Sequence, residues 1–167
     1  MIARPAIEPV IMEMADTDRL SPELLLWSAG RLLGEGRQPR EAVGERGNSA
    51  VRFTSDDSLA ELCDRANSAT LKPLSTLSRA AWLSADCILT HALTDGNGRL
   101  SRALFQWTLL RDGLIDKPIF PLGPIIHLRR ARHAMAVSEL SNTGRWSIFI
   151  DHLLDCFHQT ICLSELN

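Results

Sequence analysis

Hydrophobic residues recur at helical spacing along most of the chain. Ser21, Pro22 and Glu23 predict the start of a first helix, because serine caps helix N-termini and proline is tolerated at the first helical position. Leucines and a tryptophan then supply a largely apolar helix, which is expected to stop near Gly34 and Gly36.

The same spacing predicts five further helices, which are expected after a cap at residues 55–58 and over residues 74–89, 99–113, 124–140 and 146–163. Polar residues 36–49 predict a loop or an irregular hairpin, and alternation at residues 50–53 predicts a short strand. The tryptophans in these stripes are expected to anchor the core (Trp27, Trp82, Trp107 and Trp146). The pattern therefore predicts a mainly α-helical fold with one small β element.

The chain has the size and composition of a single globular domain, with 167 residues of which 45% are hydrophobic and 23% charged. A net charge of −2 gives no sign of a nucleic-acid partner or of a basic membrane-surface protein. Apolar stretches are far shorter than a membrane span, and residues 1–14 lack the continuous apolar core of a signal peptide. We therefore expect neither nucleic acid nor membrane among the partners.

The four cysteines are not spaced as Cys-x-x-Cys, and each lies in an apolar or amphipathic run (Cys63, Cys87, Cys156 and Cys162). This placement favours buried, reduced thiols. Such thiols are compatible with a cytoplasmic protein and equally with an effector delivered into another cell.

The most informative segment is His-Ala-Leu-Thr-Asp-Gly-Asn-Gly-Arg-Leu-Ser-Arg at residues 91–102. Its histidine can take a proton near neutral pH, and its carboxylate can hold Mg²⁺. Its glycines let backbone N–H groups approach phosphate oxygens, and its two arginines can bind the remaining phosphate charge. Each group taken alone would more often belong to an ordinary helix end, a turn or a solvated helix face. Their occurrence together, at these spacings, indicates chemistry on a nucleoside triphosphate.

This segment resembles the motif of the Fic family, His-Pro-Phe-x-(Asp/Glu)-Gly-Asn-Gly-Arg-x-x-Arg. Two positions depart from it, because Ala92 replaces the usual proline and Leu93 the usual phenylalanine. The resemblance implies a Fic fold, in which a helical bundle carries a small β-hairpin flap upstream of the active-site loop. It covers roughly residues 45–160, so we expect a Fic core domain over residues 45–163 and an N-terminal helical segment, residues 1–44, packed on it.

The helix that begins near the first arginine offers free N–H groups and a partial positive charge to an anion. We expect Gly96, Asn97 and Gly98 to cradle the α and β phosphates of ATP, with the asparagine amide as an additional donor. The resemblance implies that Arg99 neutralises the β and γ phosphates and that Arg102, one turn further along, faces the γ phosphate.

The remaining roles follow from the same resemblance. Asp95 is expected to hold Mg²⁺ between the phosphates, and His91 to act as the general base. The histidine would take the proton from a serine, threonine or tyrosine hydroxyl of a target protein, which then attacks the α phosphorus. The implied activity is that of a protein adenylyltransferase, with Mg²⁺ as cofactor and ATP as co-substrate.

Two expectations concern partners. The strand Val51, Arg52 and Phe53 resembles the second strand of the flap and could dock a target peptide by strand addition, or could simply be a hairpin edge. No Ser or Thr has a Glu four residues later, so the inhibitory pattern (Ser/Thr)-x-x-x-Glu-(Gly/Asn) of many Fic proteins is absent from the sequence. A small antitoxin-like protein could supply the inhibitory glutamate in trans, or the enzyme could be unrestrained.

Other residues receive structural interpretations. The remaining histidines show no metal-ligand spacing (His127, His133, His152 and His158), and Arg129, Arg130 and Arg132 are interpreted as a solvated face with at most a minor role at the nucleotide pocket. Two alternative functions stay open. One is a Fic-fold enzyme that transfers another nucleotide or a phosphate, as Doc toxins do, and the other is a degenerate Fic module that only binds a partner.

Overall fold

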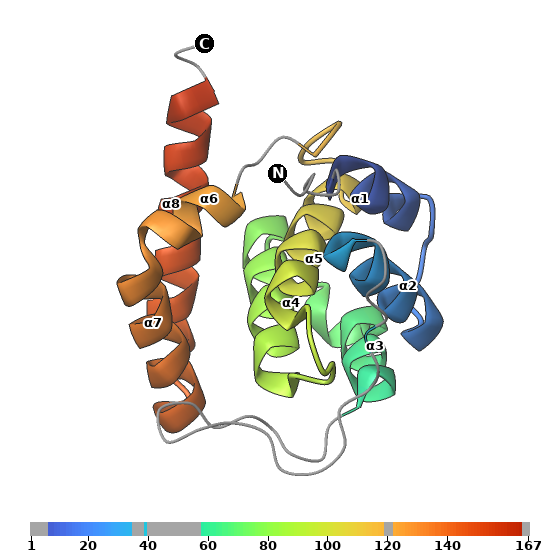
Figure 1. Cartoon of the computed structure of the whole chain (residues 1–167), viewed down its shortest axis with the longest axis horizontal. Coiled ribbons are helices and arrows are strands. Elements are labelled where there is room, and N and C mark those ends of the chain that lie inside the picture. The colour runs from blue at the N-terminus through green and yellow to red at the C-terminus, as the bar shows by residue number, and fades with distance from the viewer. Residues whose placement is uncertain (1–6, 35–38, 40–57, 119–121, 165–167) are drawn as a thin grey trace.

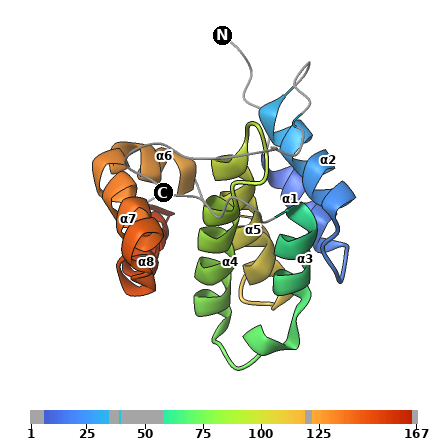
Figure 2. The ribbon, with the colours of Figure 1, turned by 90° about the horizontal axis from the view of Figure 1, so that it is seen from below.

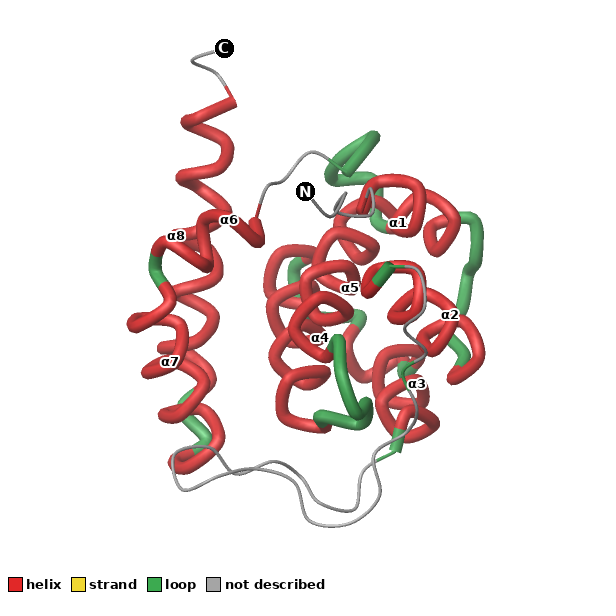
Figure 3. The backbone as a smooth tube through the Cα atoms, in the orientation of Figure 1, coloured by secondary structure: helices red, strands yellow, loops and turns green. Residues whose placement is uncertain are grey.

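The computed structural model describes residues 7–34, 39, 58–118 and 122–164, and they form a mainly α-helical molecule (Figures 1 and 3). The helices are α1 (Ile7–Ala15), α2 (Pro22–Leu33), α3 (Leu59–Asn67), α4 (Thr76–Thr90), α5 (Asn97–Arg111), α6 (Leu122–Leu128), α7 (Arg130–Thr143) and α8 (Trp146–Ser164), with a short 3₁₀ turn at Ala69–Leu71. No strand occurs among the described residues. The expected flap strand Val51, Arg52 and Phe53 lies outside them.

Local capping rules account for two helix starts that the sequence predicts. Helix α2 begins at Pro22, where the Ser21 side chain accepts a hydrogen bond from the Leu24 N–H group. Helix α3 begins after Ser58, which forms a capping box with Glu61. Both starts are confirmed, because the interactions that fix them lie within four residues of each other.

Two predicted helix bounds are wrong, and one helix was not predicted. The helix expected over residues 124–140 is two helices, because Arg129, with φ −104° and ψ 24°, departs from helical geometry between α6 and α7. Helix α5 starts at Asn97 rather than Arg99, because the glycine-rich turn already enters the helix. Helix α1 was not predicted, although Val10, Ile11 and Met14 carry its buried stripe.

Helices α4 and α5 pair along their length at the centre of the fold (Figure 1). Figures 1 and 2 show α1, α2 and α3 on one side of this pair and α6, α7 and α8 on the other. Each of the two helices therefore needs apolar residues on opposite faces, and both have them.

Two hydrophobic clusters fill the space on the two sides of the α4–α5 pair. On the side of α1, α2 and α3, the pair contributes Leu83 and Cys87 from α4, and Leu100, Leu104 and Trp107 from α5. On the side of α6, α7 and α8 it contributes Ala80, Ala81 and Ala85 from α4, and Phe105 and Leu109 from α5. The buried residues of α4 on this second side are all small.

Cysteine and tryptophan environments partly match the expectations. Cys63, Cys87 and Cys156 are buried free thiols as predicted, whereas Cys162 is exposed near the end of α8. Trp107 is fully buried, while Trp82 and Trp146 are half-buried and stack on each other with ring centroids 5.8 Å apart. Among the described residues, no helix is long and apolar enough to cross a membrane.

We expect Trp107→Phe to lower the free energy of unfolding by about 2 kcal/mol. The buried indole N–H of Trp107 donates to the Met14 carbonyl at 3.0 Å and so ties α5 to α1. Phenylalanine would leave a small cavity and would remove the hydrogen bond between the two helices, while the Met14 carbonyl keeps its hydrogen bonds from Thr17. Urea denaturation measures the change, and Trp27→Phe at a half-buried position of α2 is the control. Equal losses in the two variants would contradict this account.

Candidate active site

The loop between α4 and α5 begins at a strained residue. His91 follows the last residue of α4 and adopts the left-handed conformation, with φ 44° and ψ 39°. It is the only non-glycine residue with positive φ in the part of the chain that the structure describes. Such a backbone costs a non-glycine residue about 1–2 kcal/mol, and residues held in strained conformations cluster at functional sites. The conformation turns the chain out of the helix directly at the candidate base.

The side chain of Asn97 closes the loop. Its Oδ1 accepts from the Leu93 N–H at 3.0 Å, and its Nδ2 donates to the Leu93 carbonyl at 2.7 Å. Ala92 and Leu93 are 2% and 1% exposed, so the two positions that depart from the family motif are packed into the core. The asparagine amide thus has a structural role, and the backbone N–H of Asn97 at the start of α5 can donate to a ligand.

The start of α5 presents backbone donors beside a carboxylate. Gly96 has φ +91°, a conformation that L side chains rarely adopt, and caps the helix. Asn97 and Gly98 are the first residues of α5, and the first N–H groups of a helix have no partner within it. Exposed Asp95 accepts from the Gly96 N–H at 2.7 Å. This geometry can bind an anion and hold a cation next to it.

The two motif arginines have different environments. Arg99 is exposed, and its Nη1 donates to the Leu32 carbonyl at the end of α2 at 3.1 Å. Arg102 is packed closely against Gly98 and Gly123. A Cβ atom added to either glycine would lie 3.5 Å from a guanidinium nitrogen of Arg102. Burial, and secondarily Arg99, lower the pKa of Arg102. No carboxylate among the described residues pairs with Arg102.

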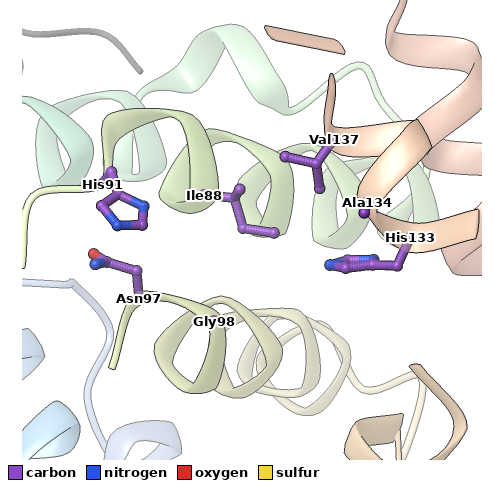
Figure 4. Close-up of a pocket in the computed structure, with 7 residues that line it drawn as sticks. All are labelled: Ile88, His91, Asn97, Gly98, His133, Ala134 and Val137. Carbon is purple, nitrogen blue, oxygen red and sulfur yellow. The ribbon is translucent and has the colours of Figure 1, made fainter. Parts of the chain in front are cut away.

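A cavity of about 250 Å³ lies between the motif and α7, and Figure 4 shows its lining. His91 and the side chain of Asn97 face each other at one end, Ile88 lies along the wall, and His133 comes from the opposite side. The full lining is Ile88, His91, Asn97, Gly98, His133, Ala134 and Val137. Except for the polar motif residues and His133, its walls are apolar.

His133 belongs to a histidine pair that the sequence analysis did not identify. Its ring centroid lies 5.3 Å from that of buried His152 on α8. Burial, with smaller contributions from His152 and Arg102, lowers the pKa of His133 to about 4. Burial, followed by Arg132 and Arg129, also lowers the pKa of His152. Both rings are therefore neutral at pH 7.

Arg130 and Arg132 are exposed, as the solvated-face interpretation predicts, whereas Arg129 is half-buried. Arg132 Nη2 lies 2.9 Å from Asp155 Oδ2 on α8, and Arg129 Nη1 lies 3.9 Å from the same oxygen. The Arg132 pair joins α7 to α8, and the longer Arg129 contact joins the start of α7 to the same carboxylate. Arg130 is exposed and has no pairing of this kind among the described residues.

A second cavity, of about 410 Å³, lies at the other end of the α4–α5 pair. Charged and polar residues line it, among them the paired Arg79 and Asp112. It contains none of the motif residues, so its larger volume does not make it the candidate active site.

The structure thus brings His91, Asn97 and Gly98 together at one cavity, and Gly96 lies in the same loop directly before Asn97. Asp95 directly precedes Gly96 and Arg99 directly follows Gly98, and both side chains are exposed. His133 was missed because the sequence gives no local signal for it: only the packing of α7 brings it to the motif. The proposed flap residues lie outside the described chain and are not placed.

Comparison with known proteins identifies a sequence family and a related fold. A sequence model described as Fic/DOC family matches residues 19–109, more than half of the chain. The structure resembles that of "Fic-1 (aa134 - 508) from C. elegans" with a TM-score of 0.61 at 20% sequence identity, over 99% of this chain and 55% of that chain. The chain thus spans about half the length of this structural relative, which shows a shared fold. No curated protein matches.

We expect His91→Gly to be more stable than His91→Ala by about 1 kcal/mol, because glycine adopts the left-handed conformation without steric cost. Urea denaturation of the two variants measures the difference. The matched control is the same pair of substitutions at Met135, exposed within α7, where glycine is expected to be the less stable residue. The same sign at both positions would contradict the strain at His91.

The histidine pair predicts a pH dependence of stability. Folding lowers the pKa of both histidines. In the unfolded chain His133 binds a proton below about pH 6.5, whereas in the folded chain it does so only below about pH 4. Stability should therefore fall as the pH falls through this window.

The measurement compares urea midpoints at pH 7 and pH 5 in the wild type and in His133→Gln. We expect the acid-induced loss to be about 1–2 kcal/mol smaller in the variant. His158→Gln, at an exposed position of α8, is the control and should behave as the wild type. An unchanged pH slope in His133→Gln would contradict the assignment.

Proposed function

Because the chain belongs to the Fic/DOC family, we propose that it is a protein adenylyltransferase that transfers AMP from Mg-ATP to a hydroxyl of a target protein. The observation that carries the proposal is the convergence of His91 and the first N–H groups of α5 on one cavity. A proton acceptor and an anion site in contact are the two elements that nucleotidyl transfer requires.

The phosphates would lie at the start of α5. The backbone N–H groups of Asn97 and Gly98, together with the helix dipole, favour negative charge there. Arg99 and Arg102 would neutralise the outer phosphates, and burial of Arg102 without a carboxylate partner among the described residues makes an anionic ligand the natural counter-charge. Catalysis at such a site comes mainly from positioning and charge stabilisation.

The residues present fit a magnesium ion that is bound together with ATP. Mg²⁺ usually takes one or two protein carboxylates and completes its shell with substrate phosphates and water. Asp95 is an exposed carboxylate next to the proposed phosphate site, and the described residues form no cluster of three or more ligands that could hold a metal alone. When bound, Mg²⁺ would supply charge neutralisation to the phosphates.

His91 would act as the general base. Its imidazole takes the proton from the target hydroxyl as that oxygen forms a bond to the α phosphorus and the bond to pyrophosphate breaks. The rigid exit from α4 would hold the imidazole at the required angle. The base of the nucleotide would occupy the apolar part of the cavity, against Ile88, Val137 and neutral His133.

The target would be a protein with an accessible serine, threonine or tyrosine, docked at residues 51–53. A small antitoxin-like protein that supplies a glutamate in trans remains the proposed regulator, since the sequence has no inhibitory pattern of its own. Transfer of another nucleotide or of a phosphate, and a purely binding role, are outcomes that the following experiment distinguishes.

We expect the wild type with Mg²⁺ and ATP labelled at the α phosphate to label a protein in whole-cell lysate, and His91→Ala to lose at least about 100-fold in rate. His158→Ala, at an exposed position on α8, is the matched control and should retain full transfer.

The label position separates the alternatives. Transfer from γ-labelled ATP alone would indicate a phosphotransferase, and labelling by His91→Ala at the wild-type rate would exclude His91 as the base. Measurable ATP binding without transfer by the wild type, repeated with the other nucleoside triphosphates, would indicate a binding module.

A further inference from the structure

One arginine ties the last turn of α4 to α3. Arg65 of α3 donates from Nε to Asp86 Oδ2 at 2.9 Å and from Nη2 to Thr90 Oγ1 at 2.8 Å. Asp86 and Thr90 are four residues apart and therefore lie on the same face of α4. A single planar guanidinium thus spans the final turn of the helix, which ends at Thr90, directly before His91.

This clamp is largely shielded from water. Thr90 is fully buried, the Asp86 side chain is 11% exposed and the Arg65 side chain is 32% exposed. Partial burial strengthens both hydrogen bonds and makes a carboxylate without its cation costly. Arg65 therefore holds a defined position rather than sampling the many conformations of a surface arginine.

The clamp lies where the backbone needs support. A left-handed non-glycine residue persists only when its surroundings fix it on both sides. On the C-terminal side of His91, the next two residues are buried and Asn97 closes the loop. On the N-terminal side, Arg65 fixes Thr90, the residue directly before His91.

We propose that Arg65, acting through Asp86 and Thr90, is a positioning residue that fixes the orientation of His91 for proton transfer. The consequence for catalysis rests on the proposed function, in which His91 is the base. Arg65 is not among the residues that line the cavity, so it acts on the imidazole without contacting the nucleotide. Its loss should therefore slow the chemical step and leave nucleotide binding unchanged.

Thr90→Val tests the clamp most cleanly, because valine keeps the shape of threonine and removes only the hydroxyl. We expect kcat to fall about tenfold while KM for ATP stays within about twofold, since a small misorientation of the base weakens proton transfer alone. Arg65→Lys keeps a cation near Asp86 but cannot form both bonds, so its kcat should fall at least as far.

Arg79→Lys is the matched control. Arg79 lies on the same helix α4, near its other end, and its Nε donates to Asp112 Oδ2 at 3.0 Å. This substitution perturbs a comparable ion pair away from His91, so kcat should not change. Equal losses of kcat in Arg79→Lys and Thr90→Val would overturn the proposal, because general loosening of α4 would then explain both.

Amide hydrogen exchange of residues 87–93, measured by mass spectrometry without nucleotide, tests the clamp independently of activity. We expect faster exchange in Thr90→Val and Arg65→Lys, and wild-type exchange of this segment in Arg79→Lys. Unchanged exchange, or full kcat in both clamp variants of an active enzyme, would overturn the positioning role and leave the proposed function intact. If the wild type transfers nothing, the proposed function fails, and the exchange rates alone decide whether Arg65 fixes the backbone at His91.

Discussion

Burial of the α4–α5 pair on two opposite sides is the constraint on which the other features depend. One cluster packs α1, α2 and α3 against the pair, and a second packs α6, α7 and α8 against its other side. Neither central helix can rotate or slide without exposing apolar surface on both sides. The loop at their shared end is consequently held between rigid supports, which allows it to keep a strained His91 and exposed N–H groups in place.

The packing of the helices also decides which arginines have a carboxylate partner. The guanidinium groups of Arg65, Arg79 and Arg132 each have a carboxylate of another helix or helix end within hydrogen-bond distance, and these pairs join neighbouring elements. Arg102 is more enclosed than a surface arginine and has no such carboxylate among the described residues. Its desolvation is therefore not offset within the described chain. Its guanidinium lies against Gly98, one of the residues that line the cavity shared with neutral His133.

Several features could be predicted from the sequence because their causes are local. The starts of α2 and α3 depend on Ser21 and Ser58, which bond to residues within three positions of themselves. The break between α6 and α7 could not be predicted, since the basic residues around Arg129 suit a continuous helix. The Asn97 side chain illustrates the same limit: the motif suggests a ligand donor, whereas the folded loop uses the amide to hold Leu93.

By itself, the sequence determined the helical class, the family motif and the order of chemical groups along residues 91–102. Spacing and residue type carry that information, because capping, helical periodicity and the motif operate over a few residues. Only the tertiary structure decided that His133 faces the motif across a cavity and that Arg65 reaches Thr90. Those contacts join residues distant in the chain, and they depend on which helices pack together rather than on any pattern within one of them.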